Sequence, residues 1–206
     1  MARLSRSDID KMGFAFVGEN VLISDRASFH NCPNISLGNN VRIDDFCVLS
    51  AGAGGIEIGN YVHVAVYSSL IGKGRIVLSD FCNVSSRVSI YSSSDDYSGA
   101  TMTNPMVPEA FTNVLHAEVR LGRHAILGSG CVVLPGVVIG EGVAVGALSM
   151  VSENCRAFGI YAGTPAKFVK ERKRDLLELE KQLVATVGAV PIGEHPVSTG
   201  RQNIRK

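Results

Sequence analysis

Tryptophan is absent from the 206 residues of this chain. Glycine, in contrast, occurs 22 times, and valine, isoleucine and serine are frequent. This composition disfavours a helical bundle and favours short strands joined by tight turns. The length is that of one domain with a substantial core.

An excess of charge of either sign is also missing. The chain has 20 lysine and arginine residues against 19 aspartate and glutamate residues. Surfaces that bind nucleic acid or acidic membranes carry a basic excess, so the balance excludes an electrostatic footprint of that kind. We therefore expect no nucleic-acid partner.

Long apolar runs are missing as well. No segment approaches the roughly 18 apolar residues of a transmembrane helix, and the start, MARLSRSDIDKMG, lacks the apolar core of a signal peptide. We expect no membrane insertion and a cytoplasmic location.

Paired cysteines are the last absence. The five cysteines are well separated and never form a CxxC pair: Cys32, Cys47, Cys82, Cys131 and Cys155. An odd, scattered set encodes neither a disulfide framework nor a zinc site, so we expect small, buried, reduced side chains.

The sequence does contain a six-residue period. An aliphatic residue recurs at every sixth position: Leu121, Leu127, Val133, Ile139, Val145 and Val151. A period of six matches neither a helix face nor plain strand alternation, but it fits a short strand plus a turn with one inward residue per unit. Three units make an 18-residue coil, so Leu121 is expected to stack under Ile139. The prediction is an all-β solenoid with the shape of a triangular prism.

Residues 91–118 break this period and contain Pro105 and Pro108. Such a segment predicts a long excursion loop that leaves the solenoid at one corner. Long loops in a regular scaffold are usually functional or form an interaction arm.

Three parts are predicted along the chain, namely residues 1–13, 14–160 and 161–206. The first is expected to hold a short helix, capped at Ser5 or Ser7, that ends at Gly13.

The third part is expected to contain a helix over 170–186. One side of this helix carries Leu176, Leu179 and Leu183. The tail that follows has no period and is expected to be mobile.

The segment LGRHAILGSGCVVLPGVVIGEGVAVGALSMV, followed by YAGTPAKFVKER, resembles the hexapeptide-repeat acyltransferases. This left-handed parallel β-helix family contains galactoside, maltose and xenobiotic acetyltransferases, and the resemblance covers about residues 20–172. It implies a left-handed coil, a homotrimer, acetyl-CoA as acyl donor, and an active site between two neighbouring prisms. The implied activity is transfer of acetyl to a sugar hydroxyl or amine, with a polysaccharide or nucleotide-sugar acceptor.

The family pattern assigns coenzyme A contacts to seven positions: Ser129, Ala147, Ser152, Gly163, Thr164, Lys167 and Lys170. Small side chains at Ser129 and Ala147 would let the pantetheine arm approach the prism, and the two lysines would meet the phosphates. Two alternatives stay open, because a crowded corner also selects small residues and Lys170 could be the first turn of a solvated helix.

Many members of the family carry a catalytic histidine in the excursion loop, and the pattern places Asp95 at that position. Three schemes follow. His116 could act as general base with an aspartate orienting its ring. Alternatively, Asp95 or Asp96 could be the base with its pKa raised by burial and by the neighbouring acid. In the third scheme the acceptor is an amine, which needs only to be neutral and well placed, while a carboxylate or water takes the proton.

Substrate contacts are predicted at His63 and Tyr67, which could face the cleft between subunits, although His63 could equally be a plain surface residue. The other three histidines are expected to be structural or exposed: His30, His124 and His195.

No cysteine falls in the excursion loop, so direct attack on the thioester is expected rather than a covalent carrier. We expect no metal site, because no two histidines lie one coil apart with ligand spacing. The alternatives are a γ-carbonic-anhydrase-like metalloenzyme and a non-catalytic trimeric scaffold.

Overall fold

The structure is a computed structural model in which residues 2–187 are described. The predicted tail and His195 lie outside the described residues. The described chain divides into two compact units, the first of which ends at Arg172.

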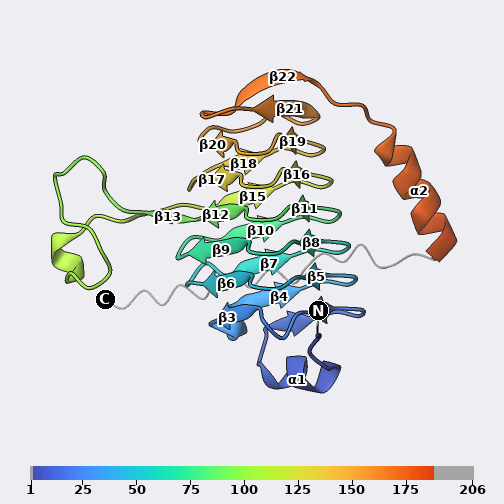
Figure 1. The fold of residues 1–206 in the computed structure, drawn as a ribbon, viewed down its shortest axis with the longest axis horizontal. Coiled ribbons are helices and arrows are strands. Elements are labelled where there is room, and N and C mark those ends of the chain that lie inside the picture. The colour runs from blue at the N-terminus through green and yellow to red at the C-terminus, as the bar shows by residue number, and fades with distance from the viewer. Residues whose placement is uncertain (1, 188–206) are drawn as a thin grey trace, which may run out of the picture. The chain divides into compact units, whose positions relative to one another are not determined.

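The first unit is a parallel β-helix of about seven turns (Figure 1). Its first sheet has six strands: β1 (Phe16–Val17), β4 (Ile35–Leu37), β7 (Ile56–Ile58), β10 (Ile76–Leu78), β15 (Val119–Leu121) and β18 (Val138–Ile139). The second sheet has eight strands: β2 (Leu22–Ile23), β5 (Arg42–Ile43), β8 (His63–Val64), β11 (Asn83–Val84), β16 (Ile126–Leu127), β19 (Ala144–Val145), β21 (Gly159–Ala162) and β22 (Lys167–Glu171). The third sheet has six strands: β3 (Ser28–His30), β6 (Val48–Ala51), β9 (Ser69–Gly72), β12 (Ser89–Tyr91), β17 (Val132–Val133) and β20 (Met150–Val151).

Each turn of the solenoid passes through three corners. The first corner leads from the first sheet to the second, the second corner from the second sheet to the third, and the third corner back to the first sheet. These three names are used below.

The predicted stacking of inward aliphatic residues is confirmed. Leu121 pairs with Ile139 in the first sheet, Leu127 with Val145 in the second, and Val133 with Val151 in the third. These side chains are almost completely buried and form one continuous core along the prism axis.

The N-terminal helix, α1 (Arg6–Lys11), begins at Ser5 as predicted. The Ser5 hydroxyl accepts a hydrogen bond from the Asp8 N–H, and the Asp8 carboxylate accepts one from the Ser5 N–H, so the two form a capping box. Gly13, with φ of +71°, follows the helix end.

The C-terminal helix, α2 (Leu176–Val187), starts later than predicted. Residues 167–171 form β22, which pairs antiparallel with β21 and lengthens the second sheet. The compact prism therefore extends past residue 160, to Arg172.

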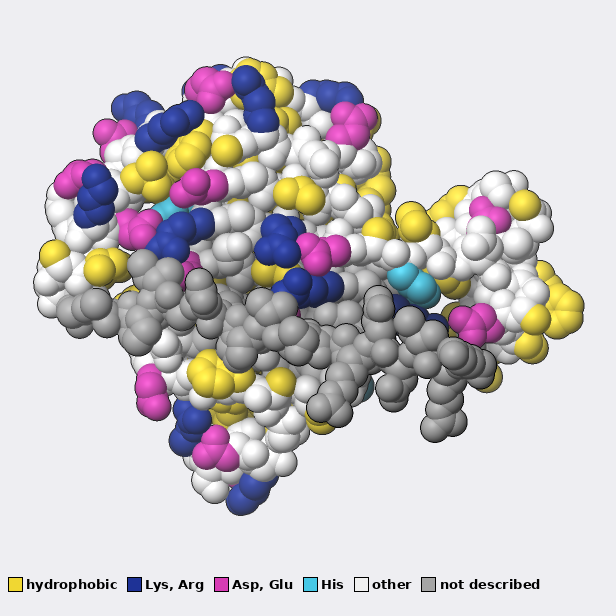
Figure 2. All heavy atoms as spheres, turned by 180° about the vertical axis from the view of Figure 1, so that it is seen from behind, with side chains coloured by type: hydrophobic (Ala, Val, Ile, Leu, Met, Phe, Trp, Pro, Cys, Tyr) yellow, Lys and Arg dark blue, Asp and Glu magenta, His cyan; other side chains and the backbone are white. Residues whose placement is uncertain are grey.

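The excursion loop leaves the prism at the third corner (Figure 1). Its two ends pair antiparallel as β13 (Ser93–Ser94) and β14 (Leu115–His116), and it contains a short 3-10 helix, η2 (Glu109–Phe111). A second 3-10 helix, η1 (Cys32–Asn34), lies at the third corner of an earlier coil. Hydrophobic side chains gather along the outer edge of the excursion loop (Figure 2). Among the residues of this loop, Tyr97 and Met106 are 92% and 89% exposed.

All five cysteines are free, and four of them are buried as expected, whereas Cys32 is only half-buried. Among residues 2–187, neither helix combines the length and the apolar character needed to cross a bilayer.

Candidate active site

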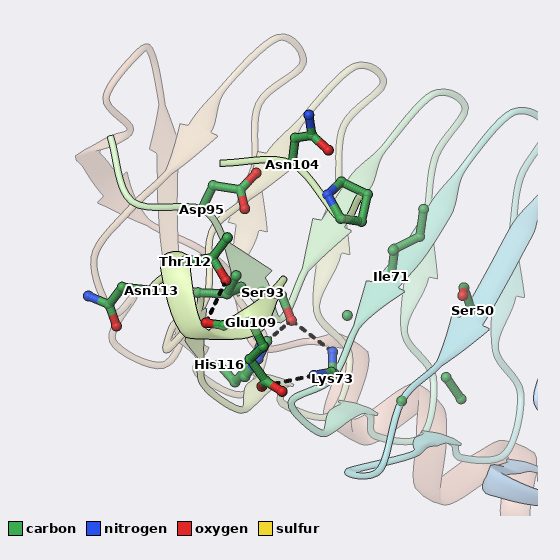
Figure 3. A pocket seen from close by; sticks show the side chains of 15 residues that line it. Ser50, Ile71, Lys73, Ser93, Asp95, Asn104, Glu109, Thr112, Asn113 and His116 are labelled. Carbon is green, nitrogen blue, oxygen red and sulfur yellow. Dashed lines mark hydrogen bonds and ion pairs between the residues drawn. The ribbon is translucent and has the colours of Figure 1, made fainter. Parts of the chain in front are cut away.

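A pocket of about 680 Å³ lies where the excursion loop leaves the prism. The ends of β6 and β9 form one side, and loop residues form the other. Asp95 and Asn104 lie toward one end of this loop pocket, while His116, Lys73 and Glu109 lie toward the other (Figure 3).

His116 is held by a serine. Its Nδ1 atom lies 2.8 Å from Ser93 Oγ, and the same oxygen accepts a hydrogen bond from the Lys73 N–H at 2.8 Å. Antiparallel pairing of β13 with β14 places Ser93 directly opposite His116. Within one chain, therefore, Ser93 orients the ring, and Nε2 has no hydrogen-bond partner among the described residues.

The two adjacent aspartates differ in their surroundings. Asp96 accepts hydrogen bonds from the Ser98 N–H at 2.8 Å and from Thr101 Oγ1 at 2.9 Å. These bonds, with those of Ser98 first, hold the pKa of Asp96 below its ordinary value, so the expected raised pKa is wrong for this residue. Asp96 stabilises a turn, whereas the exposed Asp95 carboxylate has no partner within residues 2–187.

Four of the seven predicted coenzyme positions meet at the second corner. Ser129 and Ala147 occupy equivalent places in successive coils, where the Leu148 N–H donates to the Ser129 carbonyl at 2.9 Å. The Gly163 N–H donates to Ser149 Oγ at 3.0 Å, and Thr164 Oγ1 donates to the Leu148 carbonyl at 3.2 Å. Because these bonds keep residues 163–164 against the corner, the four positions form one exposed surface.

The other three predicted coenzyme positions lie elsewhere. Ser152 follows β20 and so belongs to the third corner. Lys167 Nζ lies 3.6 Å from the carboxylate of Glu153, the neighbour of Ser152. Lys170 lies in β22 and pairs with Ile160 of β21, so the alternative that Lys170 begins a helix is wrong.

His63, predicted to contact substrate, has both ring nitrogens engaged within the chain. Nε2 lies 2.9 Å from Asp44 Oδ2, and Nδ1 lies 3.2 Å from Asn83 Oδ1, so the ring links three coils. Burial alone would raise the pKa of Asp44, but hydrogen bonds and charge from Arg42 and His63 hold it below its ordinary value. This network gives His63 a structural task.

Tyr67, the other predicted substrate contact, lies at the second corner with 52% of its surface exposed. Its ring stacks on Phe46 with centroids 4.9 Å apart, and Arg87 lies over its other face. The sequence interpretation missed Phe46, Arg87 and Ser93. Reading the repeat column by column would have found the first two, because Phe46, Tyr67 and Arg87 hold equivalent corner positions.

Within one chain, the predicted site residues fall into two separate groups. The second corner, with Ser129 and Ala147, precedes the strands of the third sheet, whereas Asp95 and His116 follow them. The predicted coenzyme positions at the second corner and the loop pocket therefore lie at opposite ends of the strands of that sheet. Within residues 2–187, no three histidine, cysteine, aspartate or glutamate side chains cluster to hold a metal ion.

Comparisons with known proteins bear on the family and the activity. Residues 118–153 match the family described as bacterial transferase hexapeptide (six repeats). The dTDP-4-amino-4,6-dideoxy-D-glucose acyltransferase of Escherichia coli is 58% identical over 180 residues, which are 87% of this chain and 94% of that protein. This chain belongs to the hexapeptide-repeat acyltransferases.

Two solved structures extend the comparison of this hexapeptide-repeat acyltransferase. AntD, an N-acyltransferase from Bacillus cereus in complex with dTDP and 3-hydroxybutyryl-CoA, is 45% identical, with a TM-score of 0.86 over 90% of this chain and 97% of AntD. A maltose O-acetyltransferase from Clostridium difficile 630 is 19% identical, with a TM-score of 0.56 over 82% of this chain and 75% of that one, and shares the fold. The predicted family, fold and acyl-transfer activity are confirmed, and the scaffold and carbonic-anhydrase alternatives are set aside.

Proposed function

We propose that this acyltransferase moves an acetyl group from acetyl-CoA to the amino group of a dTDP-linked 4-amino-4,6-dideoxy sugar. The Escherichia coli relative is named for that acceptor and matches over nearly its whole length. AntD, which is an N-acyltransferase, is described with dTDP and with coenzyme A or an acyl-CoA.

The observation that carries the proposal is the free carboxylate of Asp95 at the loop position where the family pattern has a histidine. An amine needs far less activation than a hydroxyl, so a carboxylate that positions the amine and accepts a proton is sufficient. The amine nitrogen attacks the thioester carbonyl carbon, the C–N bond forms and the C–S bond breaks. The proton from nitrogen passes to Asp95 and then to the departing thiolate.

A spacing supports a role for Asp95. Structures of AntD include variants at one serine and one aspartate that lie ten positions apart in its chain. Ser85 and Asp95 have this spacing here, as do Ser86 and Asp96. Ser85 and Ser86 belong to the second corner, so the spacing links that corner to the excursion loop.

The proposal includes a homotrimer in which the loop of one protomer reaches the second corner of the next. A single chain keeps the two halves apart, and the loop exposes Tyr97, Met102, Met106 and Phe111 to solvent. Exposed apolar side chains gathered on one edge are typical of a protein interface. A cytoplasmic location is part of the same proposal, because the free cysteines suit a reducing compartment.

Acceptor choice tests the proposed reaction. The purified chain is mixed with acetyl-CoA and either dTDP-4-amino-4,6-dideoxyglucose or dTDP-glucose, and thiol release is measured. We expect turnover with the amino sugar alone, whereas faster turnover of a hydroxyl acceptor would contradict N-acylation.

Variants of the loop separate the catalytic schemes. Asp95→Asn should lower kcat by roughly 100-fold with unchanged coenzyme A affinity, while His116→Ala should lower it less than about 10-fold. Asp96→Asn serves as control, because that carboxylate is engaged in a turn. The reverse ranking of Asp95 and His116 would support the histidine-base scheme.

Assembly is tested by light scattering and by mixing. We expect a mass near three times the 21.9 kDa of one chain. Asp95→Asn chains and Ala147→Trp chains, each with strongly reduced activity alone, should regain activity when unfolded and refolded together, because some sites then pair an intact loop with an intact corner. No recovery in mixed trimers would place both halves in the same chain.

A further inference from the structure

An exposed column of aromatic rings and arginines runs along the second corner. Phe46 and Tyr67 stack nearly parallel, at 12°, with centroids 4.9 Å apart. The guanidinium carbon of Arg26 lies 5.6 Å from the Phe46 centroid, and that of Arg87 lies 5.8 Å from the Tyr67 centroid. The resulting order along the prism axis is Arg26, Phe46, Tyr67, Arg87, one residue per coil.

Both arginines of this column lack a carboxylate partner among the described residues. Six other arginines lie between positions 42 and 172, and each is bonded to a carboxylate or to backbone carbonyls: Arg42, Arg75, Arg120, Arg123, Arg156 and Arg172. Of the acids at this corner, Asp44 binds Arg42 and His63, Asp45 accepts a bond from Ser24, and Asp25, next to Arg26 in the chain, forms no ion pair with it. The guanidinium groups of Arg26 and Arg87 are therefore not held in ion pairs within the described residues.

The backbone conformation of the column is one that bulky residues avoid. Phe46, Tyr67 and Arg87 have φ values of +59°, +63° and +61°. Glycine and asparagine adopt this left-handed region at lower cost. The same conformation recurs at the first corner, at Tyr61, Phe81 and His124, so it belongs to the repeat, and it directs the column side chains outward in register.

The column continues directly into the surface assigned to the acyl donor. The Arg87 N–H donates to the Val66 carbonyl at 3.0 Å, and the Gly130 N–H of the next coil donates to the Ser86 carbonyl at 3.0 Å. Ser129 precedes Gly130, so the small-residue surface begins one coil after Arg87. Adjacent coils are about 4.8 Å apart, which gives a column of about 14 Å from Arg26 to Arg87.

We propose that the Arg26–Phe46–Tyr67–Arg87 column binds the nucleoside diphosphate of the acceptor, an assignment that rests on the proposed function. Arg87, nearest to the acyl-donor surface, takes the diphosphate, because a guanidinium fork matches phosphate oxygens. The exposed ring edges of Tyr67 and Phe46 contact the nucleoside, and Arg26 closes the far end. The sugar then extends toward Ser86, where the amine can meet the thioester.

Calorimetric titration with dTDP tests the assignment. Arg87→Gln should weaken dTDP binding at least about 10-fold, and Tyr67→Ala about 5- to 10-fold, while coenzyme A binding stays unchanged in both. Arg87→Lys should give an intermediate loss, because the charge remains and the fork is removed. The matched controls are Arg120→Gln, an exposed arginine on the first sheet, and Tyr61→Ala, a stacked tyrosine at the first corner.

The outcomes separate the two proposals. Loss confined to the column variants, with wild-type mass by light scattering, supports the subsite. If the wild type binds dTDP and transfers the acyl group, but the column variants bind dTDP as tightly as the wild type, the subsite is rejected and the proposed function stands. If the wild-type chain neither binds dTDP nor acylates the amino sugar, the proposed function fails and the subsite fails with it. If the column variants lose dTDP binding only when the trimer also dissociates, the column is a contact between subunits and the assignment is rejected.

Discussion

Two aromatic columns occupy two corners of the same prism, and they differ in what surrounds their cations. At the first corner, Tyr61, Phe81 and His124 stack with centroids 5.0 and 4.8 Å apart, and Arg123 lies 4.8 Å from the Phe81 centroid. Arg123 also donates to Asp80 Oδ2 at 3.0 Å. This first-corner column is half-buried and carries its own counter-charge.

At the second corner, Phe46 and Tyr67 are 42% and 52% exposed, and neither Arg26 nor Arg87 forms an ion pair among residues 2–187. Both columns use the same repeat position and the same left-handed backbone. Stacking alone therefore does not mark a site. The missing carboxylate distinguishes a column that stabilises the coil from one that can accept an anionic ligand.

Charge reversal in the second-corner column (Arg26, Phe46, Tyr67 and Arg87), whose arginines form no ion pair among the described residues, should give the largest effect. Arg87→Glu places a carboxylate where the diphosphate is proposed to bind, so the acceptor KM should rise at least about 100-fold. Steady-state kinetics with acetyl-CoA held saturating would measure this change, and the thermal unfolding midpoint should remain near that of the wild type. An unchanged acceptor KM would show that the second-corner column does not bind the diphosphate of the acceptor.

Removing the ion pair of the first-corner column should lower the stability of the fold rather than substrate binding. Arg123→Ala leaves the largely buried Asp80 carboxylate without its charged partner, which should lower the free energy of unfolding by about 1–3 kcal/mol. The control Arg120→Ala removes an exposed ion pair and should change it by less than about 1 kcal/mol. Denaturant titration gives both values. A rise in acceptor KM for Arg123→Ala would mean that the two columns share a ligand.

The difference between the columns shows how far the sequence could lead. Inward stacking was predictable because the aliphatic period is local and regular. The partner of Arg123 was not, since Asp80 lies 43 residues earlier, on the other side of the excursion loop. The bond between Ser93 and His116 also depends on how the loop ends pair. At the other end of the prism, a charged segment that resembles a helix start forms β22, because the open edge of β21 was available for pairing.

The position of Asp95 was reached from the family pattern, and its free carboxylate became visible only in the structure. By contrast, Asp96 is bonded to Ser98 and Thr101, and His116 is bonded to Ser93 across the two ends of the same loop. Loops close through side-chain hydrogen bonds that no periodic pattern encodes. The roles of the two aspartates could therefore not be separated from sequence.

Supplying the second corner with a carboxylate should have an intermediate effect. Val66 lies in the coil below Arg87, to which its carbonyl is hydrogen-bonded, and it is half-buried. Val66→Asp should neutralise part of the Arg87 charge and raise the Kd for dTDP roughly 3- to 10-fold. Val66→Asn is the matched control of nearly equal size. Equal affinities in the two variants would show that charge at this corner does not govern binding.

The smallest expected effect is on the pH dependence of stability and concerns Asp44. This carboxylate binds Arg42 and His63 and forms no ion pair with Arg26 or Arg87. Because its folded-state pKa lies below the unfolded value of about 3.9, ionised Asp44 stabilises the fold above that pH, and this contribution is lost as the pH falls through the folded pKa. The difference in unfolding free energy between wild type and Asp44→Asn should thus be constant near neutrality and shrink below about pH 4. Denaturant titrations between pH 7 and pH 3 would measure it, and a difference that grows on acidification would reverse the assigned sign. If Asp44→Asn also strengthened dTDP binding markedly at pH 7, the charge of Asp44 would be weakening the attraction of Arg26 and Arg87 for the ligand. The distinction drawn between the two columns would then be wrong.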